Sequence, residues 1–242
     1  YQRLHGQPSN DAEDAGQSVT AMRASAPFTS EQIKVLTVTD IDTFYRRRLQ
    51  SLPQLCDLIA TLQRAHSGRY LVAMPSYEYL HHLAKSPHRP DNFIAQTPAM
   101  DEAQQLALLK KFRQASSAVL GIVMGGVFAE SLDLGAGVVD GVVVVSLGLP
   151  PTDLIRSLSV NYFNSSYGSG WGEQVAYLQP ALTRVVQAAG RVIRGPQDKG
   201  VICLVDPRFA DPIITRFYPE YWRPENILMK DVESRLETFW SN

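Results

Sequence analysis

The sequence has few cysteines, no long apolar run and no excess of charge of either sign. Two Cys in 242 residues cannot by themselves form a four-cysteine iron–sulfur cluster or zinc site. No apolar run approaches the roughly 18 residues of a membrane span, and no basic-then-apolar signal peptide opens the chain. The formal net charge is −1, so any nucleic-acid contact must be local. We therefore expect a soluble intracellular protein with no membrane partner.

The composition favours a globular protein, and the length suits one large domain or two small ones. Hydrophobic residues make up 45% of the chain, enough for a well-formed core. Cys56 and Cys203 lie among apolar neighbours, which predicts buried, reduced thiols. Residues 1–30 are polar and lack apolar periodicity, so we predict an extended lead-in followed by one domain over residues 31–242. The chain begins with Tyr1 rather than Met, and we expect it to be part of a longer polypeptide.

Short apolar runs alternate with amphipathic segments along the chain. Leu52 to Leu62 repeats at helical spacing, as does Leu106 to Phe112 after a capping Asp101. Continuous Val/Ile/Leu runs between helices indicate a parallel sheet covered on both faces, and so an α/β fold. The predicted strands are Ile33–Val38, Tyr70–Met74, Phe93–Gln96, Ala118–Val123, Val142–Leu147 and Val201–Val205.

The segment LDLGAG, residues 132–137, imitates the glycine loop of an S-adenosylmethionine-dependent methyltransferase. That loop needs a strand before it and a helix directly after it, so that backbone amides meet the ligand. Here a loop-like composition precedes the segment, and the run Val142 to Val145 follows it. LDLGAG therefore leads into a strand, which disfavours the methyltransferase.

The segment DEAQ, residues 101–104, imitates the carboxylate box that holds Mg²⁺ in nucleic-acid-dependent ATPases. That box needs an apolar strand immediately before it. The preceding residues, Thr97 to Met100, form no such strand, and the acids open a helix, where negative charge suits the helix dipole. We interpret Asp101 and Glu102 as structural.

Residues 180–195 predict one amphipathic helix that ends at Gly195-Pro196. An apolar stripe runs along it from Leu182 to Ile193, and the polar residues Gln187, Arg191 and Arg194 share the opposite face. Spacing alone favours a surface helix with solvated arginines. Gly190, however, costs about 1 kcal/mol inside a helix relative to Ala, which suggests close approach by another group.

These residues carry a resemblance to a known family. Gln187-x-x-Gly190-Arg191-x-x-Arg194 resembles motif VI, QxxGRxxR, of superfamily 2 helicases, and its continuation resembles the XPD/DinG family. Residues 124–135 resemble motif V, and residues 70–80 resemble motif IV. The resemblance covers roughly residues 27–223 and implies a RecA-like, three-layer sandwich with a mostly parallel sheet.

The chain departs from the family pattern in one respect. It contains no GxxxxGK[ST] phosphate loop, and the cluster-binding cysteines of the first motor domain are absent. The resemblance therefore implies the second, C-terminal motor domain of an ATP-dependent DNA helicase. ATP with Mg²⁺ would be bound jointly with the first motor domain of the same polypeptide, and any iron–sulfur cluster would lie outside this chain.

The resemblance also implies roles for particular residues. Arg191, Arg194 and Gln187 would reach the γ-phosphate of ATP, where planar guanidinium groups complement phosphate oxygens. Gly190, Glu130 and Asp133 would bind nucleotide or couple its site to DNA; Asp133 is equally well explained as a loop-capping carboxylate. Single-stranded DNA would contact Ser76, Tyr77, Gly125 and Gly126.

Two further segments have alternative explanations. Tyr162, Phe163, Tyr167 and Trp171 lie in a Gly/Ser-rich stretch, where they either stack on bases or anchor a mobile loop, which we prefer. Arg46-Arg47-Arg48 either contacts phosphate or forms a solvated turn, and we prefer the turn.

The family implies a monomer with 5′-to-3′ polarity that acts in DNA repair, in the cytoplasm at the nucleoid or, in a eukaryote, in the nucleus. Alone, this chain should not hydrolyse ATP. The alternatives are a non-catalytic nucleic-acid-binding module with the same fold and, less favoured, the methyltransferase.

Overall fold

The structure is a computed structural model that describes residues 28–29, 31–126, 135 and 137–241. Its centre is a seven-stranded sheet in the order β3-β4-β2-β5-β6-β1-β7, and every neighbouring pair is parallel. The strands are β1 (Ile33–Val38), β2 (Arg69–Met74), β3 (Phe93–Ala95), β4 (Ala118–Val123), β5 (Gly141–Val145), β6 (Gly200–Val205) and β7 (Pro224–Ile227).

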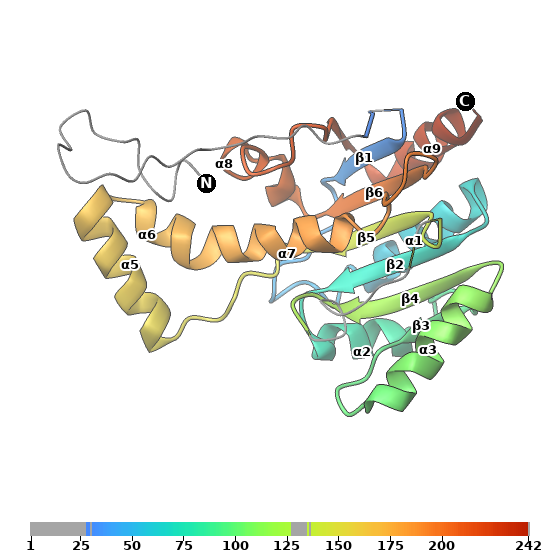
Figure 1. Ribbon diagram of the computed structural model, residues 1–242, viewed down its shortest axis with the longest axis horizontal. Helices are drawn as coiled ribbons and strands as arrows, with labels where there is room; N and C mark the ends of the chain where they lie inside the picture. The colour runs from blue at the N-terminus through green and yellow to red at the C-terminus, as the bar shows by residue number, and fades with distance from the viewer. Residues whose placement is uncertain (1–27, 30, 127–134, 136, 242) are drawn as a thin grey trace, which may run out of the picture.

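Helices cover both faces of the sheet (Figure 1). Successive strand residues point to opposite faces: Val142 and Val144 of β5 join one buried cluster, whereas Val143 and Val145 join the other. The first face carries α3 (Glu102–Gln114), α7 (Gln179–Ala189) and α8 (Pro212–Thr215). The second carries α1 (Leu52–Ala65), α2 (Tyr77–Lys85) and α9 (Val232–Ser241). The predicted α/β three-layer sandwich is confirmed, and the sheet is wholly parallel.

The predicted strands are all present, with ends shifted by no more than two residues. Strand β7 was not predicted, because its only buried residue is Ile227 and a single buried position gives no apolar pattern. Asp101 caps α3 as expected: its side chain accepts a hydrogen bond from Gln104 N at 2.8 Å, and the Gln104 side chain accepts one from Asp101 N.

The Gly/Ser-rich stretch is helical, so the prediction of a loop there is wrong. Helix α5 (Leu154–Tyr167), the short α6 (Trp171–Glu173) and the π-helical turn η1 (Gln174–Leu178) connect β5 to α7. Figure 1 shows α5 standing away from the sheet, and no residue of α5 is buried. Asp153 caps α5 by accepting a hydrogen bond from Arg156 N at 2.8 Å. The sequence signal for this helix is therefore its N-cap residue, Asp153, rather than a pattern of buried residues.

The predicted lead-in, residues 1–30, lies outside the described residues except for Phe28 and Thr29. The Phe28 ring packs edge-on against Tyr221, with centroids 5.9 Å apart. The domain boundary at residue 30 stays a prediction. Within the described residues, no helix combines the length and the apolar character that a membrane crossing requires.

Candidate functional site

The residues that follow β2 cap a helix. Ser76 is the N-cap of α2, and its Oγ accepts a hydrogen bond from Tyr79 N at 3.3 Å. Ser at this position satisfies one of the amides that a helix start leaves without a partner. The Ser76 hydroxyl hydrogen is not used by that bond, so Ser76 keeps a donor at the carboxyl edge of the sheet.

Two glycines follow the neighbouring strand at the same edge. Strands β2 and β4 pair in parallel with Met74 opposite Val123, and Met124 N donates to Met74 O at 2.9 Å. Gly125 has a φ of +68°, a backbone conformation that glycine adopts without steric cost. A Cβ atom placed on Gly126 would lie 3.9 Å from the Tyr77 hydroxyl. The structure therefore brings together Tyr77, Gly125 and Gly126, three of the residues predicted to contact DNA.

Buried Gln96 links these two segments and was not predicted. It is 5% exposed. Its Nε2 donates to the Tyr77 hydroxyl at 2.8 Å, and its Oε1 accepts from Val123 N at 3.1 Å. A glutamine at the end of a predicted strand gives no signal in the sequence, because Tyr77 and Val123, which bond to it, are distant in the chain.

Two of the predicted nucleotide-binding residues lie beside Gly125. Gln187 and Arg191 line a small cavity together with Gly125 and with Arg184, a residue that sequence reasoning did not single out. The remaining lining residues are Ile122, Met124 and Ala188. The cavity thus joins the end of β4 to α7, and it joins two sets of residues that the resemblance assigns to different ligands.

The predicted helix over residues 180–195 is too long. Helix α7 ends at Ala189 with Gly190 as its C-cap, at φ −64° and ψ 0°. Arg191 and Arg194 therefore do not share a helical face with Gln187. The apolar pattern misled because Val192 and Ile193 remain buried against the same core after the helix has ended. Gly190 is exposed, and a Cβ atom there would lie 3.2 Å from Val186 O.

A short loop follows Gly190 and holds Arg194. The carboxylate of Asp198 accepts hydrogen bonds from Arg194 N at 2.7 Å and from Gly195 N at 2.8 Å. Arg194 is exposed. Its backbone is fixed by Asp198, and its side chain lies at the surface, where a second domain can reach it.

The remaining motif V residues are partly outside the described residues, including Glu130 and Asp133. Gly135 and Gly137 are described and have φ values of +78° and +67°. The next regular element after Gly137 is β5. LDLGAG therefore leads into a strand, as predicted, and the helix that a methyltransferase loop requires does not follow it.

The prediction of a solvated turn at Arg46-Arg47-Arg48 is wrong for Arg48. Arg48 is 7% exposed, and its Nη2 lies 2.8 Å from Glu78 Oε2. Its guanidinium also lies 4.4 Å from the ring centroid of Tyr45. Arg47 pairs with Asp42 at 2.7 Å. Arg48 is a structural residue, and Arg46 and Arg47 are exposed.

The four aromatic residues of the Gly/Ser-rich stretch form a chain of ring contacts along α5 and α6. The centroids of Tyr162 and Phe163 lie 5.4 Å apart, those of Phe163 and Tyr167 5.9 Å, and those of Tyr167 and Trp171 5.9 Å. Tyr162 and Tyr167 are 63% and 56% exposed. They do not anchor a loop, which corrects the preferred interpretation, and base stacking remains a prediction.

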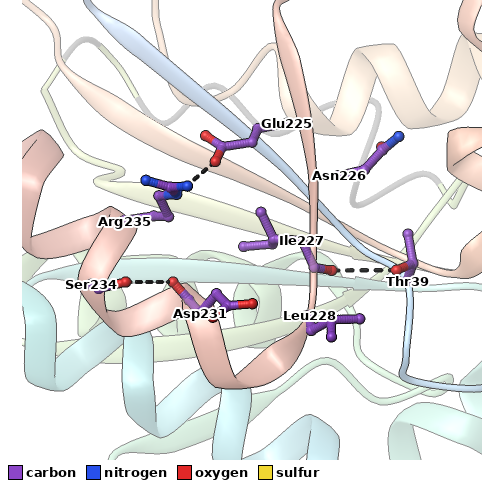
Figure 2. Close-up of a pocket in the computed structure, with 8 residues that line it drawn as sticks. All are labelled: Thr39, Glu225, Asn226, Ile227, Leu228, Asp231, Ser234 and Arg235. Atoms are coloured by element: carbon purple, nitrogen blue, oxygen red, sulfur yellow. Dashed lines mark hydrogen bonds and ion pairs between the residues drawn. The ribbon is translucent and has the colours of Figure 1, made fainter.

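A polar pocket at the β7 edge of the sheet is separate from this site (Figure 2). Its polar groups largely bond to one another: Glu225 pairs with Arg235 at 2.6 Å, and the Thr39 hydroxyl donates to Ile227 O at 3.4 Å. Glu225 also accepts a hydrogen bond from Lys34 at 2.6 Å, and this bond lowers the pKa of Glu225, with the nearby charges of Lys34 and Arg235 adding to it. None of the predicted site residues lines this pocket.

Within the described residues, no group of three or more His, Cys, Asp or Glu side chains is arranged to hold a metal ion. Cys56 and Cys203 are both buried and form no disulfide, as predicted. Burial raises the pKa of the Cys203 thiol to about 12.

Comparisons with known proteins agree with the motifs. Residues 59–225 match the family model of the helicase C-terminal domain. A probable ATP-dependent helicase of Methanocaldococcus jannaschii is 28% identical over 205 residues, which cover 77% of this chain and 30% of that protein. The chain thus spans about a third of its curated relative.

Solved structures share the fold. An XPD helicase structure superposes with a TM-score of 0.63 at 22% identity, over 81% of this chain and 35% of that one. An apo XPD structure gives 0.65 at 20% identity, over 81% and 40%. The C-terminal domain of the DEAD-box protein Dbp5 gives 0.55 at 16% identity, over 88% of this chain and 99% of that one. In the last comparison, nearly the whole of that solved domain superposes on this chain, so the two share a fold.

Proposed function

The chain belongs to the helicase C-terminal domain family, and from that premise we propose that it is the second motor domain of an ATP-dependent DNA helicase of the XPD/DinG type, with 5′-to-3′ polarity. The first motor domain of the same polypeptide supplies the phosphate loop and the ligands of Mg²⁺. This domain supplies arginines to the ATP site and one wall of the single-stranded DNA track.

The observation that carries the proposal is the cavity shared by Gln187, Arg191 and Gly125. A motor must couple a nucleotide site to a nucleic-acid site, and here a glycine of the proposed DNA edge contacts the same small cavity as two proposed nucleotide residues. Structural changes at either site can therefore be transmitted over a few ångströms of packed side chains.

The proposed chemistry at the ATP site is electrostatic. During phosphoryl transfer, negative charge develops on the oxygens of the γ-phosphate and on the leaving group. The guanidinium groups of Arg191 and Arg194 complement that charge with fixed N–H donors, and Gln187 positions the phosphate beside them. Arginines in this role accelerate hydrolysis by about 10³–10⁵ in related enzymes. Gly190 allows the nucleotide to approach the end of α7, and Glu130 and Asp133 couple the site to DNA.

The proposed DNA contacts lie at the carboxyl edge of β2 and β4, where ligands bind in open parallel sheets. The Ser76 hydroxyl and the first amides of α2 receive one phosphate, since a helix N-terminus favours anions. The backbone at Gly125 and Gly126 receives another, because no side chain blocks its approach. The Tyr77 hydroxyl lies beside the second position, 3.9 Å from a Cβ atom placed on Gly126.

The test is DNA-stimulated ATP hydrolysis by the full-length protein. Arg191→Ala and Arg194→Ala should each abolish turnover while leaving the melting temperature nearly unchanged. Arg223→Ala is the matched control. Arg223 is exposed, and the bonds of its guanidinium to other described residues go to nearby backbone carbonyls, those of Glu220 and Trp222. Turnover that persists in both site variants contradicts the proposal.

Two further measurements separate the alternatives. If the wild-type protein binds single-stranded DNA but never hydrolyses ATP, it is a non-catalytic binding module. Saturable binding of S-adenosylmethionine would instead support a methyltransferase. This chain alone should bind DNA weakly and show no ATPase activity, because it lacks the glycine-rich phosphate nest, lysine and Mg²⁺ ligands of the first motor domain.

A further inference from the structure

The side chain of Arg184 on α7 lies over Gly125, which follows the end of β4. A Cβ atom at Gly125 would lie 2.7 Å from Arg184 Nε and 2.8 Å from its Cδ. Such contacts are too short for real atoms, so the arginine occupies the space that a side chain at position 125 would fill. Any other residue at position 125 would therefore displace the Arg184 side chain.

The local sequence places Arg184 there. Leu182 and Val185 of α7 are buried in the core, which fixes the rotation of the helix on the sheet. Arg184 and Gln187 are three residues apart and hence neighbours on the helix surface. Both line the cavity at Gly125, so the rotation that buries Leu182 also directs Arg184 toward the end of β4.

Arg184 has no acceptor among the described residues, although it is half-buried. A guanidinium group carries five N–H donors. Among the described residues, no Arg184 nitrogen is a buried atom without a partner, so the unused donors of Arg184 are open to solvent and can receive an anion. The neighbouring Gly125 N–H likewise has no acceptor in the described part of the chain. An arginine side chain that lies over Gly125 with donors open to solvent can bind an anion there through charge-assisted hydrogen bonds.

We infer that Arg184 binds a phosphate of the single-stranded nucleic acid at Gly125, an assignment that rests on the proposed function. The alternative ligand is the nucleotide. Arg184 and Arg191 both line the cavity, but they differ in place. Arg184 lies on α7 over Gly125, whereas Arg191 follows the end of the helix. The arginine at the proposed DNA edge is therefore Arg184.

The test compares Arg184→Ala and Arg184→Lys in the full-length protein with wild type. The affinity for a fluorescein-labelled oligo-dT strand is measured by anisotropy at several salt concentrations. Arg184→Ala should weaken binding about tenfold, as expected for the loss of a charge-assisted hydrogen bond. Its salt slope should fall by about 0.7, the value for one phosphate contact on a single strand. Arg184→Lys should keep the salt slope but bind more weakly than wild type, because lysine retains the charge without the planar fork.

ATP kinetics distinguish the two ligands. The DNA concentration that half-saturates the ATPase should rise with the dissociation constant, whereas the KM for ATP and the kcat at saturating DNA should not change. A raised KM for ATP with unchanged DNA affinity overturns the assignment, and so do unchanged DNA affinity and salt slope in Arg184→Ala. Circular dichroism checks that each variant is folded, and Arg223→Ala is again the control. If the wild-type protein lacks ATPase activity, the proposed function fails, while the salt slope still tests Arg184.

Discussion

The Tyr77 hydroxyl lies beside Gly126 and is held there by the buried side chain of Gln96. Gln96 donates to that hydroxyl at 2.8 Å and accepts from Val123 N at 3.1 Å. One side chain therefore fixes the start of α2 relative to the end of β4. These are the two segments from which the proposed DNA edge is built, so their spacing depends on a residue that contacts no ligand.

Gln96→Ala should destabilise the domain by about 1–3 kcal/mol, because it leaves the buried Val123 N–H without an acceptor. Tyr77→Phe should cost less, about 1 kcal/mol, since only one neutral hydrogen bond is lost. Urea unfolding of this chain measures both values. Tyr162→Phe on exposed α5 is the control and should not change stability. If Gln96→Ala is as stable as wild type, Gln96 does not hold the two segments together.

Much of the fold could be predicted because continuous Val/Ile/Leu runs are typical of strands buried on both faces. The end of α7 could not, because Val192 and Ile193 pack on the same core in a non-helical loop and continue the apolar pattern. Helix α5 also escaped prediction, because it buries no residue and its apolar positions therefore follow no single face.

The site was predictable only in part. The motifs identify Gln187, Arg191, Gly125 and Gly126, yet their spacing in the sequence does not reveal that Gln187 and Gly125 line one cavity. Arg184 gave no signal, because an arginine on an amphipathic helix usually faces solvent. Its position becomes apparent only when β4 and α7 are packed against each other.

Glu225→Gln should lower stability at neutral pH and have no effect in acid. The hydrogen bond from Lys34 lowers the pKa of Glu225 in the folded protein. A lowered folded-state pKa contributes stability above the unfolded value, about 4.3, and that contribution is lost as the pH falls through the folded pKa. Because the pair is partly exposed, the loss at pH 7 should not exceed about 1 kcal/mol.

The measurement is urea unfolding of wild type and Glu225→Gln between pH 7 and pH 3. Glu237→Gln is the control, since Glu237 is exposed and belongs to none of the ion pairs described above. The two stability curves should converge below about pH 4. A difference that stays constant across this range would show that Glu225 acts through packing rather than through its charge.

Neither cysteine should react with a thiol reagent while the protein is folded. Burial raises the pKa of Cys203 to about 12 and also raises that of Cys56, and the thiolate is the reactive form. Ellman's reagent at pH 8 should therefore modify neither thiol in native buffer and both in denaturant. If a thiol reacts fast in native buffer, the Cys56→Ser variant identifies it. A reaction that persists in the variant comes from Cys203, and one that disappears comes from Cys56. Either result would contradict the burial of that thiol.

Truncating an apolar side chain of α5 should not destabilise the protein. Leu158 is 58% exposed, whereas Leu182 of α7 is 2% exposed. Leu158→Ala should change the free energy of unfolding by less than about 0.5 kcal/mol, and Leu182→Ala should cost about 3 kcal/mol. The two variants are a matched pair, and thermal unfolding measures the stability of each. A large loss in Leu158→Ala would mean that α5 packs against the domain in solution.

Asp206 should stabilise the segment that follows β6 more than any other carboxylate near it. It is fully buried. Its Oδ1 accepts from Arg208 N at 2.9 Å and from Arg208 Nε at 2.8 Å. Its Oδ2 accepts from Arg208 Nη2 at 2.6 Å and from the Thr43 hydroxyl. Through this carboxylate the segment after β1 is joined to the segment after β6, and Arg208 extends the connection to the Ser146 hydroxyl at 3.1 Å.

Asp206→Ala should cost about 3 kcal/mol, because it removes the partner of a largely buried charge and leaves Arg208 and Thr43 without their acceptor. The low end of the range for buried pairs applies, since the Arg208 side chain is 29% exposed and water can partly replace the lost acceptor. Urea unfolding of Asp206→Ala, Arg208→Ala and the double variant gives the coupling energy directly. The double variant should be more stable than the sum of the two single losses implies, because it contains no unpaired buried charge. Exposed Asp91→Ala is the control, and additive losses in the cycle would show that Asp206 and Arg208 stabilise the domain independently.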